Sequence, residues 1–124
     1  MEDATIHILD KAKCGLVAGQ KMLIPTNTDI EAALRKLTPG SVTSGPAFRA
    51  LVAKPLNADG CCTFATNKEL RAITERACAA LANGISQSNV LPFWRVITPG
   101  NTIAKRLNLD AETLRQLLTS DVGH

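Results

Sequence analysis

The four cysteines of this sequence are its candidate nucleophiles. A cysteine attacks through its thiolate, which forms at neutral pH when a neighbouring base or positive charge lowers the thiol pKa from about 8.5. The two histidines, His7 and His124, are adjacent to none of the four cysteines. We therefore predict no transferase activity and no catalytic residues among these side chains.

The spacing of the cysteines also argues against a metal site. Cys14, the adjacent pair Cys61 and Cys62, and Cys78 match no zinc-binding signature, so we predict no metal ion and no other cofactor. Reduced cysteines commonly act as small apolar fillers, and the place of Cys78 in the middle of a predicted helix favours that role. Cys61 and Cys62 fall on a predicted connector and remain the candidates for a reactive, alkyl-accepting thiol.

The segment around the only tryptophan offers binding chemistry that the cysteines lack. Trp94 follows Phe93, and each aromatic face that stacks on an extruded nucleotide base contributes about 1–3 kcal/mol. Extruding a base costs a few kcal/mol, and least at a damaged or mispaired position. A pocket built from these side chains would therefore select lesions without any reaction of its own.

Local signals predict a hairpin for this segment. Pro99-Gly100 indicates a tight turn, so we expect a strand over Phe93–Ile97 and a return strand over Asn101–Ala104. Strand alternation puts Phe93 at the pocket and Trp94 in or near the core. The alternative is a hairpin in which the aromatic side chains only plug the core.

The order of residue types in Pro92-Phe93-Trp94-Arg95-Val96 resembles the active-site motif Pro-Cys-His-Arg-Val of the methylated-DNA alkyltransferase family. Phe93 stands at the position of the acceptor cysteine, and Trp94 at that of the activating histidine. The chain therefore looks like the alkyltransferase-like branch, in which a bulky aromatic replaces the cysteine and the protein recognises DNA without accepting the alkyl group. Met22–Thr26 is similar to a Met-Leu-Ile-Pro-Thr segment of small bacterial proteins that have a Pro-Tyr-Trp-Arg-Val motif.

The resemblance implies a DNA site in two parts. In the family, a recognition helix enters the minor groove, and an arginine from it fills the space that the flipped nucleotide leaves. Arg71 is the best match to that arginine and Lys68 is its competitor, while Arg95 is expected to support local structure. The residues assigned to DNA contact are Asn67, Lys68, Arg71, Lys105 and Arg106, and those assigned to the lesion pocket are Pro92, Phe93, Trp94, Arg95 and Val96.

Four helices are predicted from apolar periodicity and end signals. Capping boxes at Thr28–Glu31 and Thr66–Glu69 each begin one helix, and Asn83-Gly84 ends the second. Pro46–Ala53 forms another, and Asp110 caps a C-terminal helix.

The helix that begins at the second capping box has a polar face, which helical periodicity identifies without reference to the family. Lys68, Arg71 and Glu75 share that face on a 3.6-residue period. They can be a solvated surface with an Arg71–Glu75 pair, which does not exclude DNA contact.

The fold class that we expect is mainly α with a small β wing, as in a winged helix-turn-helix-like DNA-binding domain. Residues 1–24 form an N-terminal extension with a weak helix over Asp3–Lys13, and residues 25–124 form the alkyltransferase-like winged helix domain. Lys21–Ile24 reads as an extended segment, because it is a short apolar run closed by Pro25.

Composition limits the partners only loosely. The net charge of +3 and the pI near 8.8 permit an anionic partner. No apolar run approaches the roughly 18 residues of a membrane span, and the acidic start Met1-Glu2-Asp3 is unlike a signal peptide. We expect a cytoplasmic monomer.

The function that we expect is non-enzymatic recognition of alkylated or damaged guanine in double-stranded DNA by nucleotide flipping, with a repair protein as a further partner. The alternative is a catalytically dead scaffold that acts as a protein-interaction or regulatory module.

Overall fold

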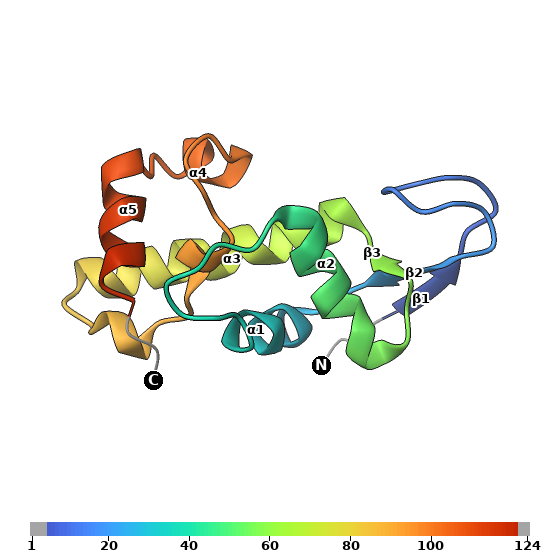
Figure 1. Ribbon diagram of the computed structural model, residues 1–124, viewed down its shortest axis with the longest axis horizontal. Helices are drawn as coiled ribbons and strands as arrows, with labels where there is room; N and C mark the ends of the chain where they lie inside the picture. Colours follow the sequence, from blue (N-terminus) through green and yellow to red (C-terminus); the bar gives the residue numbers. More distant parts are fainter. Residues whose placement is uncertain (1–4, 122–124) are drawn as a thin grey trace.

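The computed structural model describes residues 5–121 and is organised around one long helix, α3 (Thr63–Ala82). Figure 1 shows α3 running along the molecule, with a small sheet near one end and the C-terminal helices towards the other. In chain order, the other elements are β1 (Thr5–Ile8), β2 (Lys21–Ile24), α1 (Asn27–Arg35), α2 (Gly45–Ala53), η1 (Lys54–Leu56), β3 (Gly60–Cys61), η2 (Gln87–Asn89), η3 (Phe93–Arg95), α4 (Thr102–Arg106) and α5 (Ala111–Thr119).

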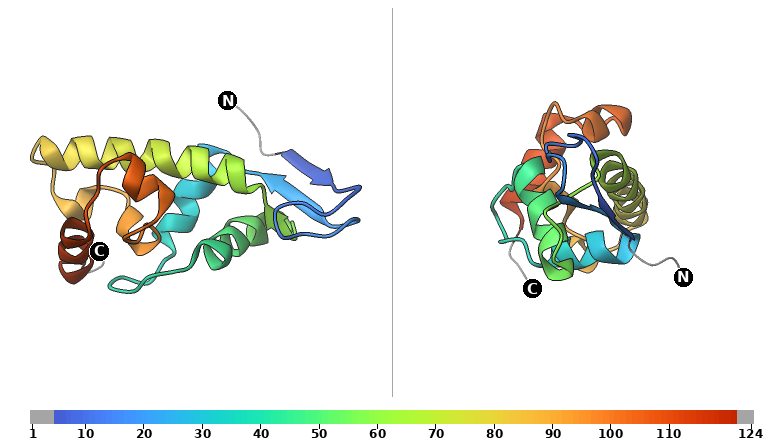
Figure 2. Two further views of the ribbon diagram at one scale, coloured as in Figure 1. Left: turned by 90° about the horizontal axis from the view of Figure 1, so that it is seen from above. Right: turned by 90° about the vertical axis from the view of Figure 1, so that its right-hand side faces the viewer.

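Helix α3 lies along one edge of the molecule in the left view of Figure 2, with the other helices on one side of it. In Figure 1, α1 is drawn below α3 and α4 above it. None of the helices within residues 5–121 combines the length and the hydropathy that crossing a membrane requires. The mainly helical architecture with a small sheet confirms the predicted fold class at that level.

The sheet has three strands in the order β1-β2-β3. β1 pairs antiparallel with β2, and β2 pairs parallel with β3 through Met22↔Gly60 and Leu23↔Cys61. The central strand is the buried one, with Leu23 fully inaccessible. The prediction of an extended segment at Lys21–Ile24 is confirmed.

The weak helix predicted over Asp3–Lys13 is wrong for the residues described, because Thr5–Ile8 form the edge strand β1. Apolar Ile6 and Ile8 alternate with polar neighbours, which is the period of a strand. The pairing partner β2 lies more than ten residues further along the chain, so local helical spacing could not reveal it. Asp3 itself lies outside the described residues.

The predictions of α1, α2 and α5 are confirmed, but the cap of α1 lies at another residue than predicted. α1 begins after Thr26, whose side chain accepts from the backbone N–H of Asp29 while the Asp29 carboxylate accepts from the Thr26 N–H. The capping box therefore lies two residues before the predicted Thr28. α2 begins after Ser44, and α5 begins after Asp110 as predicted.

The predicted cap of α3 is wrong, because the helix begins at Thr63 and contains Thr66 in its first turns. The buried Thr66 hydroxyl donates to the Cys62 carbonyl at 2.8 Å, inside the helix. Cys62 is the N-cap residue and provides no side-chain hydrogen bond. The predicted end is confirmed, with Asn83 as the C-cap and Gly84 at φ +88°.

The two strands predicted around the Pro99-Gly100 turn are wrong. Phe93–Arg95 form the 3-10 turn η3, closed by hydrogen bonds from the Val96 and Ile97 N–H groups to the Phe93 carbonyl. Asn101 then caps the short helix α4 by accepting from the Ile103 N–H at 2.8 Å. All side chains from Pro92 to Ile97 are buried. The segment therefore lacks the alternation of buried and exposed side chains that a half-buried strand shows.

The core has two parts. The main cluster joins β2, the helices and η3, and its fully buried large side chains include Phe48, Phe93, Leu34 and Ile97. A small second cluster lies at the sheet end, formed by Leu9, Met22 and Cys62 with Cys14, Leu16, Ile24 and Ala65 packed against it.

The observed cap of α1 predicts an asymmetry between two neighbouring threonines. Thr26→Ala should lower the free energy of unfolding by about 1 kcal/mol, because an N-cap hydroxyl is lost. Thr28→Ala, inside α1, should leave it nearly unchanged. Urea unfolding followed by Trp94 fluorescence measures both. Equal losses in the two variants would contradict the cap placement.

Candidate functional site

The motif is held in place by a buried ion pair between Arg95 and Asp121. Nε and Nη2 of Arg95 donate to the two carboxylate oxygens of Asp121, each at 2.7 Å, in the bidentate geometry that favours this pairing. The side chains are 9% and 4% exposed. The third donor, Nη1, bonds to the Leu37 carbonyl at 3.0 Å, so the guanidinium is satisfied without solvent.

Asp121 connects this ion pair to the loop after α1. The backbone N–H of Gly40 donates to Oδ2 of Asp121 at 2.9 Å. The Arg95 guanidinium is the largest cause that lowers the pKa of Asp121, from 3.8 to about 2, and the Gly40 N–H and the Trp94 indole act in the same direction. Asp121 is therefore a carboxylate at neutral pH and balances the buried charge of Arg95.

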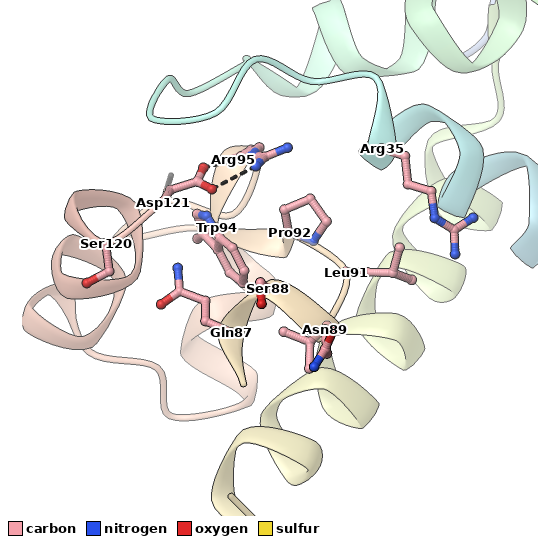
Figure 3. A pocket seen from close by; sticks show the side chains of 11 residues that line it. Arg35, Gln87, Ser88, Asn89, Leu91, Pro92, Trp94, Arg95, Ser120 and Asp121 are labelled. Atoms are coloured by element: carbon pink, nitrogen blue, oxygen red, sulfur yellow. Dashed lines mark hydrogen bonds and ion pairs between the residues drawn. The ribbon is translucent and has the colours of Figure 1, made fainter. Parts of the chain in front are cut away.

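A cavity of about 460 Å³ lies directly beside the ion pair. Figure 3 shows its lining, with Trp94, Arg95 and Asp121 on one side and Arg35 at the end of α1 across from them. The residues around it are Arg35, Gln87, Ser88, Asn89, Val90, Leu91, Pro92, Trp94, Arg95, Ser120 and Asp121. The cavity thus combines an apolar wall with amide and hydroxyl groups and one exposed cation.

Trp94 contributes a buried wall to this cavity. The residue is 3% exposed, and its ring packs edge-on against Phe93 with the centroids 5.2 Å apart. Its indole Nε1 is buried and has no hydrogen-bond partner of good geometry within the described residues. The indole is one of the smaller causes, after Arg95 and the Gly40 N–H, that lower the pKa of the Asp121 carboxyl.

The structure divides the predicted pocket residues. Pro92, Trp94 and Arg95 line the cavity, whereas Phe93 and Val96 are buried in the main core and do not. The prediction that Phe93 faces the pocket and Trp94 the core is therefore wrong for Phe93, which is fully inaccessible. It rested on strand alternation, and a 3-10 turn does not follow that period.

The other residues of the cavity were not predicted from the sequence. Arg35, Ser120 and Asp121 come from helix ends far from the motif in the chain, and no local pattern connects them to it. The polar residues Gln87, Ser88 and Asn89 form part of the cavity wall, and nothing in their composition indicated that position. Only the tertiary fold brings these segments together.

The predicted DNA-contacting residues lie on two elements outside the cavity. Asn67, Lys68, Lys105 and Arg106 are exposed and Arg71 is partly exposed. Lys68 and Arg71 precede the end of α3 by 14 and 11 residues, which corresponds to about 17–21 Å along the helix. Lys105 and Arg106 belong to α4, which Figure 1 draws above α3, whereas α1 is drawn below it. No ion pair joins Arg71 to Glu75 within residues 5–121.

All four cysteines are free, and their environments differ. Burial raises the pKa of the Cys61 thiol to about 11 and also raises that of Cys78, so neither forms a thiolate readily. Cys62 is buried as a member of the second cluster. Within residues 5–121, no group of three or more His, Cys, Asp or Glu side chains gathers as metal ligands do.

Comparison with known proteins found no matching family model, no matching curated protein and no matching solved structure.

The buried ion pair makes a prediction about stability and pH. Asp121→Ala should cost about 3 kcal/mol at pH 7, because the Arg95 charge stays buried without its partner. The folded-state pKa of about 2 lies below the ordinary 3.8, so the contribution of the carboxylate is complete well above pH 4 and is lost as the pH falls towards 2.

Urea unfolding of the wild type and Asp121→Ala between pH 7 and pH 2.5 measures this difference. Glu75→Ala, which removes an exposed carboxylate on α3, is the matched control and should change little at any pH. A loss for Asp121→Ala that stays constant down to pH 2.5 would contradict the assignment.

Proposed function

We propose that the chain is a non-enzymatic DNA-binding protein of the alkyltransferase-like type, which holds an extruded alkylated or damaged guanine in the cavity beside Trp94 and Arg95. The observation that carries the proposal is the position of the cavity of about 460 Å³. It lies at the Pro92–Val96 motif, where the resemblance places a flipped nucleotide.

The lining of the cavity suits a nucleobase. Val90, Leu91 and Pro92 supply apolar surface for the flat ring, and buried stacking of this kind favours an extruded base. Ser88 and Asn89 supply donors and acceptors for the polar edge of the base. Gln87 is already committed, since its Nε2 donates to the Leu117 carbonyl at 2.7 Å.

Arg35 supplies a cation at the rim of the same cavity. Its side chain is 64% exposed and has one distant partner, Glu31, at 3.8 Å on the same helix. In this proposal Arg35 contacts the phosphate next to the extruded nucleotide. Such a contact positions the backbone and carries no sequence information.

The exposed cations of α3 contact the duplex on either side of the extruded nucleotide. Lys68 and Arg71 are the two candidates for the side chain that enters the vacated space. Lys105 and Arg106 are the corresponding candidates on α4, which Figure 1 draws apart from α1. Single alanine variants of Lys68, Arg71, Lys105 and Arg106 would rank the contributions of these four side chains to DNA affinity.

The environment of the motif supports binding without reaction. Phe93 and Trp94 occupy the positions of the acceptor and the activating base in the resemblance, and both are buried. Cys61, one of the two alternative acceptors, has a raised pKa because of burial, which disfavours the thiolate that alkyl transfer requires.

Tryptophan fluorescence tests the proposal directly, because the chain has one Trp and no Tyr. A short duplex with one O6-alkylated guanine should bind more tightly than its unmodified counterpart and should quench or shift Trp94 emission. Added salt should weaken both complexes. No binding to either duplex, or binding without any change at Trp94, would contradict the base pocket.

A matched pair of variants locates the contact. Arg35→Ala should weaken lesion binding several-fold and reduce the slope of affinity against salt by about one ion. Arg115→Ala removes an equally exposed arginine that also pairs with a glutamate on its own helix, and it should leave binding unchanged. Equal effects would indicate a general charge effect and no contact at the cavity.

A second candidate function is a protein-interaction module, which exposed apolar side chains at the sheet end favour. Phe64 is 77% exposed, Ile8 73% and Val17 60%. They belong to the start of α3, to β1 and to the loop between β1 and β2, which Figure 1 places at the same end of the molecule. Exposed apolar surface of this kind often marks a protein contact.

Affinity capture tests this second candidate. A partner of the wild type should be lost with the double variant Ile8→Ser and Phe64→Ser and retained with Val42→Ser, which changes an exposed valine in the loop before α2. Equal capture by all three proteins would contradict a partner site at the sheet end. DNA binding by the double variant should remain as in the wild type.

A further inference from the structure

The loop between β1 and β2 presents Cys14 in a strained turn. The backbone groups of Lys13 and Leu16 bond to each other in both directions at 2.9 Å, which closes a two-residue turn over Cys14 and Gly15. Both residues have positive φ, 54° and 80°, as a type I′ turn requires. Cysteine seldom adopts this conformation, so the fold imposes the position of the thiol.

This turn places the Cys14 sulfur at the start of α3. The backbone N–H of Thr63 donates to Cys14 Sγ at 3.4 Å, where the N-cap residue Cys62 offers no side-chain acceptor. The Thr63 N–H is the largest cause that lowers the pKa of Cys14, and the positive charge of Lys13 acts in the same direction. A thiolate at this position is therefore stabilised by the helix terminus.

A second cysteine, Cys62, lies close to Cys14 in the fold. The Cys14 sulfur accepts from the N–H of Thr63, the residue that directly follows Cys62, although Cys14 and Cys62 are 48 positions apart in the chain, and the Cys62 side chain also contributes to the lowered pKa of Cys14. Cys62 is 8% exposed and belongs to the small cluster with Leu9 and Met22, against which Cys14 packs. Cys14 is half-buried, so a small oxidant reaches it first.

The other two thiols point elsewhere. Cys61 lies next to Cys62 on the chain but faces the main core, where its thiol donates to the Arg49 carbonyl at 3.2 Å. Cys78 packs against the main core from the middle of α3. Among the described residues, Cys14 and Cys62 are therefore the two cysteines that share the small cluster.

We propose that Cys14 and Cys62 form a redox-reactive thiol pair, in which the Cys14 thiolate attacks peroxide and the Cys62 thiol then resolves the oxidised Cys14. The Cys14 thiolate displaces hydroxide from hydrogen peroxide and becomes a sulfenic acid. The Cys62 sulfur then attacks that sulfenic sulfur and releases water, which leaves a disulfide. The net reaction converts two thiols and one peroxide into one disulfide and two waters.

The disulfide would join the loop between β1 and β2 to the first turn of α3. It closes a long segment of the chain, and constraining such a segment restricts the unfolded ensemble. Oxidation would therefore stabilise the sheet end. This inference does not depend on the proposed DNA site, because the cavity is lined by residues from the end of α1, the segment 87–95 and the end of α5.

Mass spectrometry of the full chain tests the proposal. Treatment with a small molar excess of hydrogen peroxide should remove two hydrogens from the intact mass, and dithiothreitol should restore them. Proteolysis without reductant should yield one linked pair of peptides that contains Cys14 and Cys62. The midpoint of thermal unfolding should rise by roughly 10 °C on oxidation.

Three serine variants complete the design. Cys14→Ser and Cys62→Ser should each abolish the two-hydrogen loss, whereas Cys78→Ser should retain it. Competitive labelling of the unoxidised wild type by iodoacetamide requires no variant to fold, and Cys14 should react fastest. The proposal is overturned if another thiol reacts faster, if fragmentation of the linked peptides places the bond at Cys61 or Cys78, if the bond joins two chains, or if all four thiols survive.

Discussion

The buried ion pair between Arg95 and Asp121 is the constraint on which the C-terminal half of the structure depends. It joins the motif to the chain after α5, and the Leu37 carbonyl and Gly40 N–H extend it to the loop after α1. Two charges that are almost inaccessible to solvent stabilise the fold only while each satisfies the other. The guanidinium therefore fixes three segments that are distant in sequence.

The same constraint explains the shape of the candidate site. Because Arg95 is drawn inward to Asp121, the motif closes into the 3-10 turn η3 and does not extend as a strand. The turn buries Phe93 in the core and leaves Trp94 as a wall of the cavity. The cavity is thus a consequence of how the end of α1, the segment after α3 and the end of α5 meet around one arginine.

The helix α3 connects this region with a chemically different one at the sheet end. There the small cluster around Leu9 and Met22 holds the Cys14 and Cys62 thiols together at the helix start. The exposed polar face of α3, which includes Lys68, runs between the two regions. Base recognition and thiol oxidation are therefore proposed for separate places, and each can be altered by substitutions that leave the other intact.

The sequence by itself determined the helices whose signals are local. The apolar period and the caps at Ser44 and Asp110 identify α2 and α5, and the apolar run at Lys21–Ile24 identifies the central strand. Even a displaced cap, as in α1, left the helix itself correctly predicted.

The tertiary structure decided the rest. β1 is a strand because β2 pairs with it, and the motif is a turn because Asp121 binds Arg95. Arg35 with Asp121, and Cys14 with Cys62, come together only through folding, since contacts between residues far apart in the chain leave no periodic trace in the sequence.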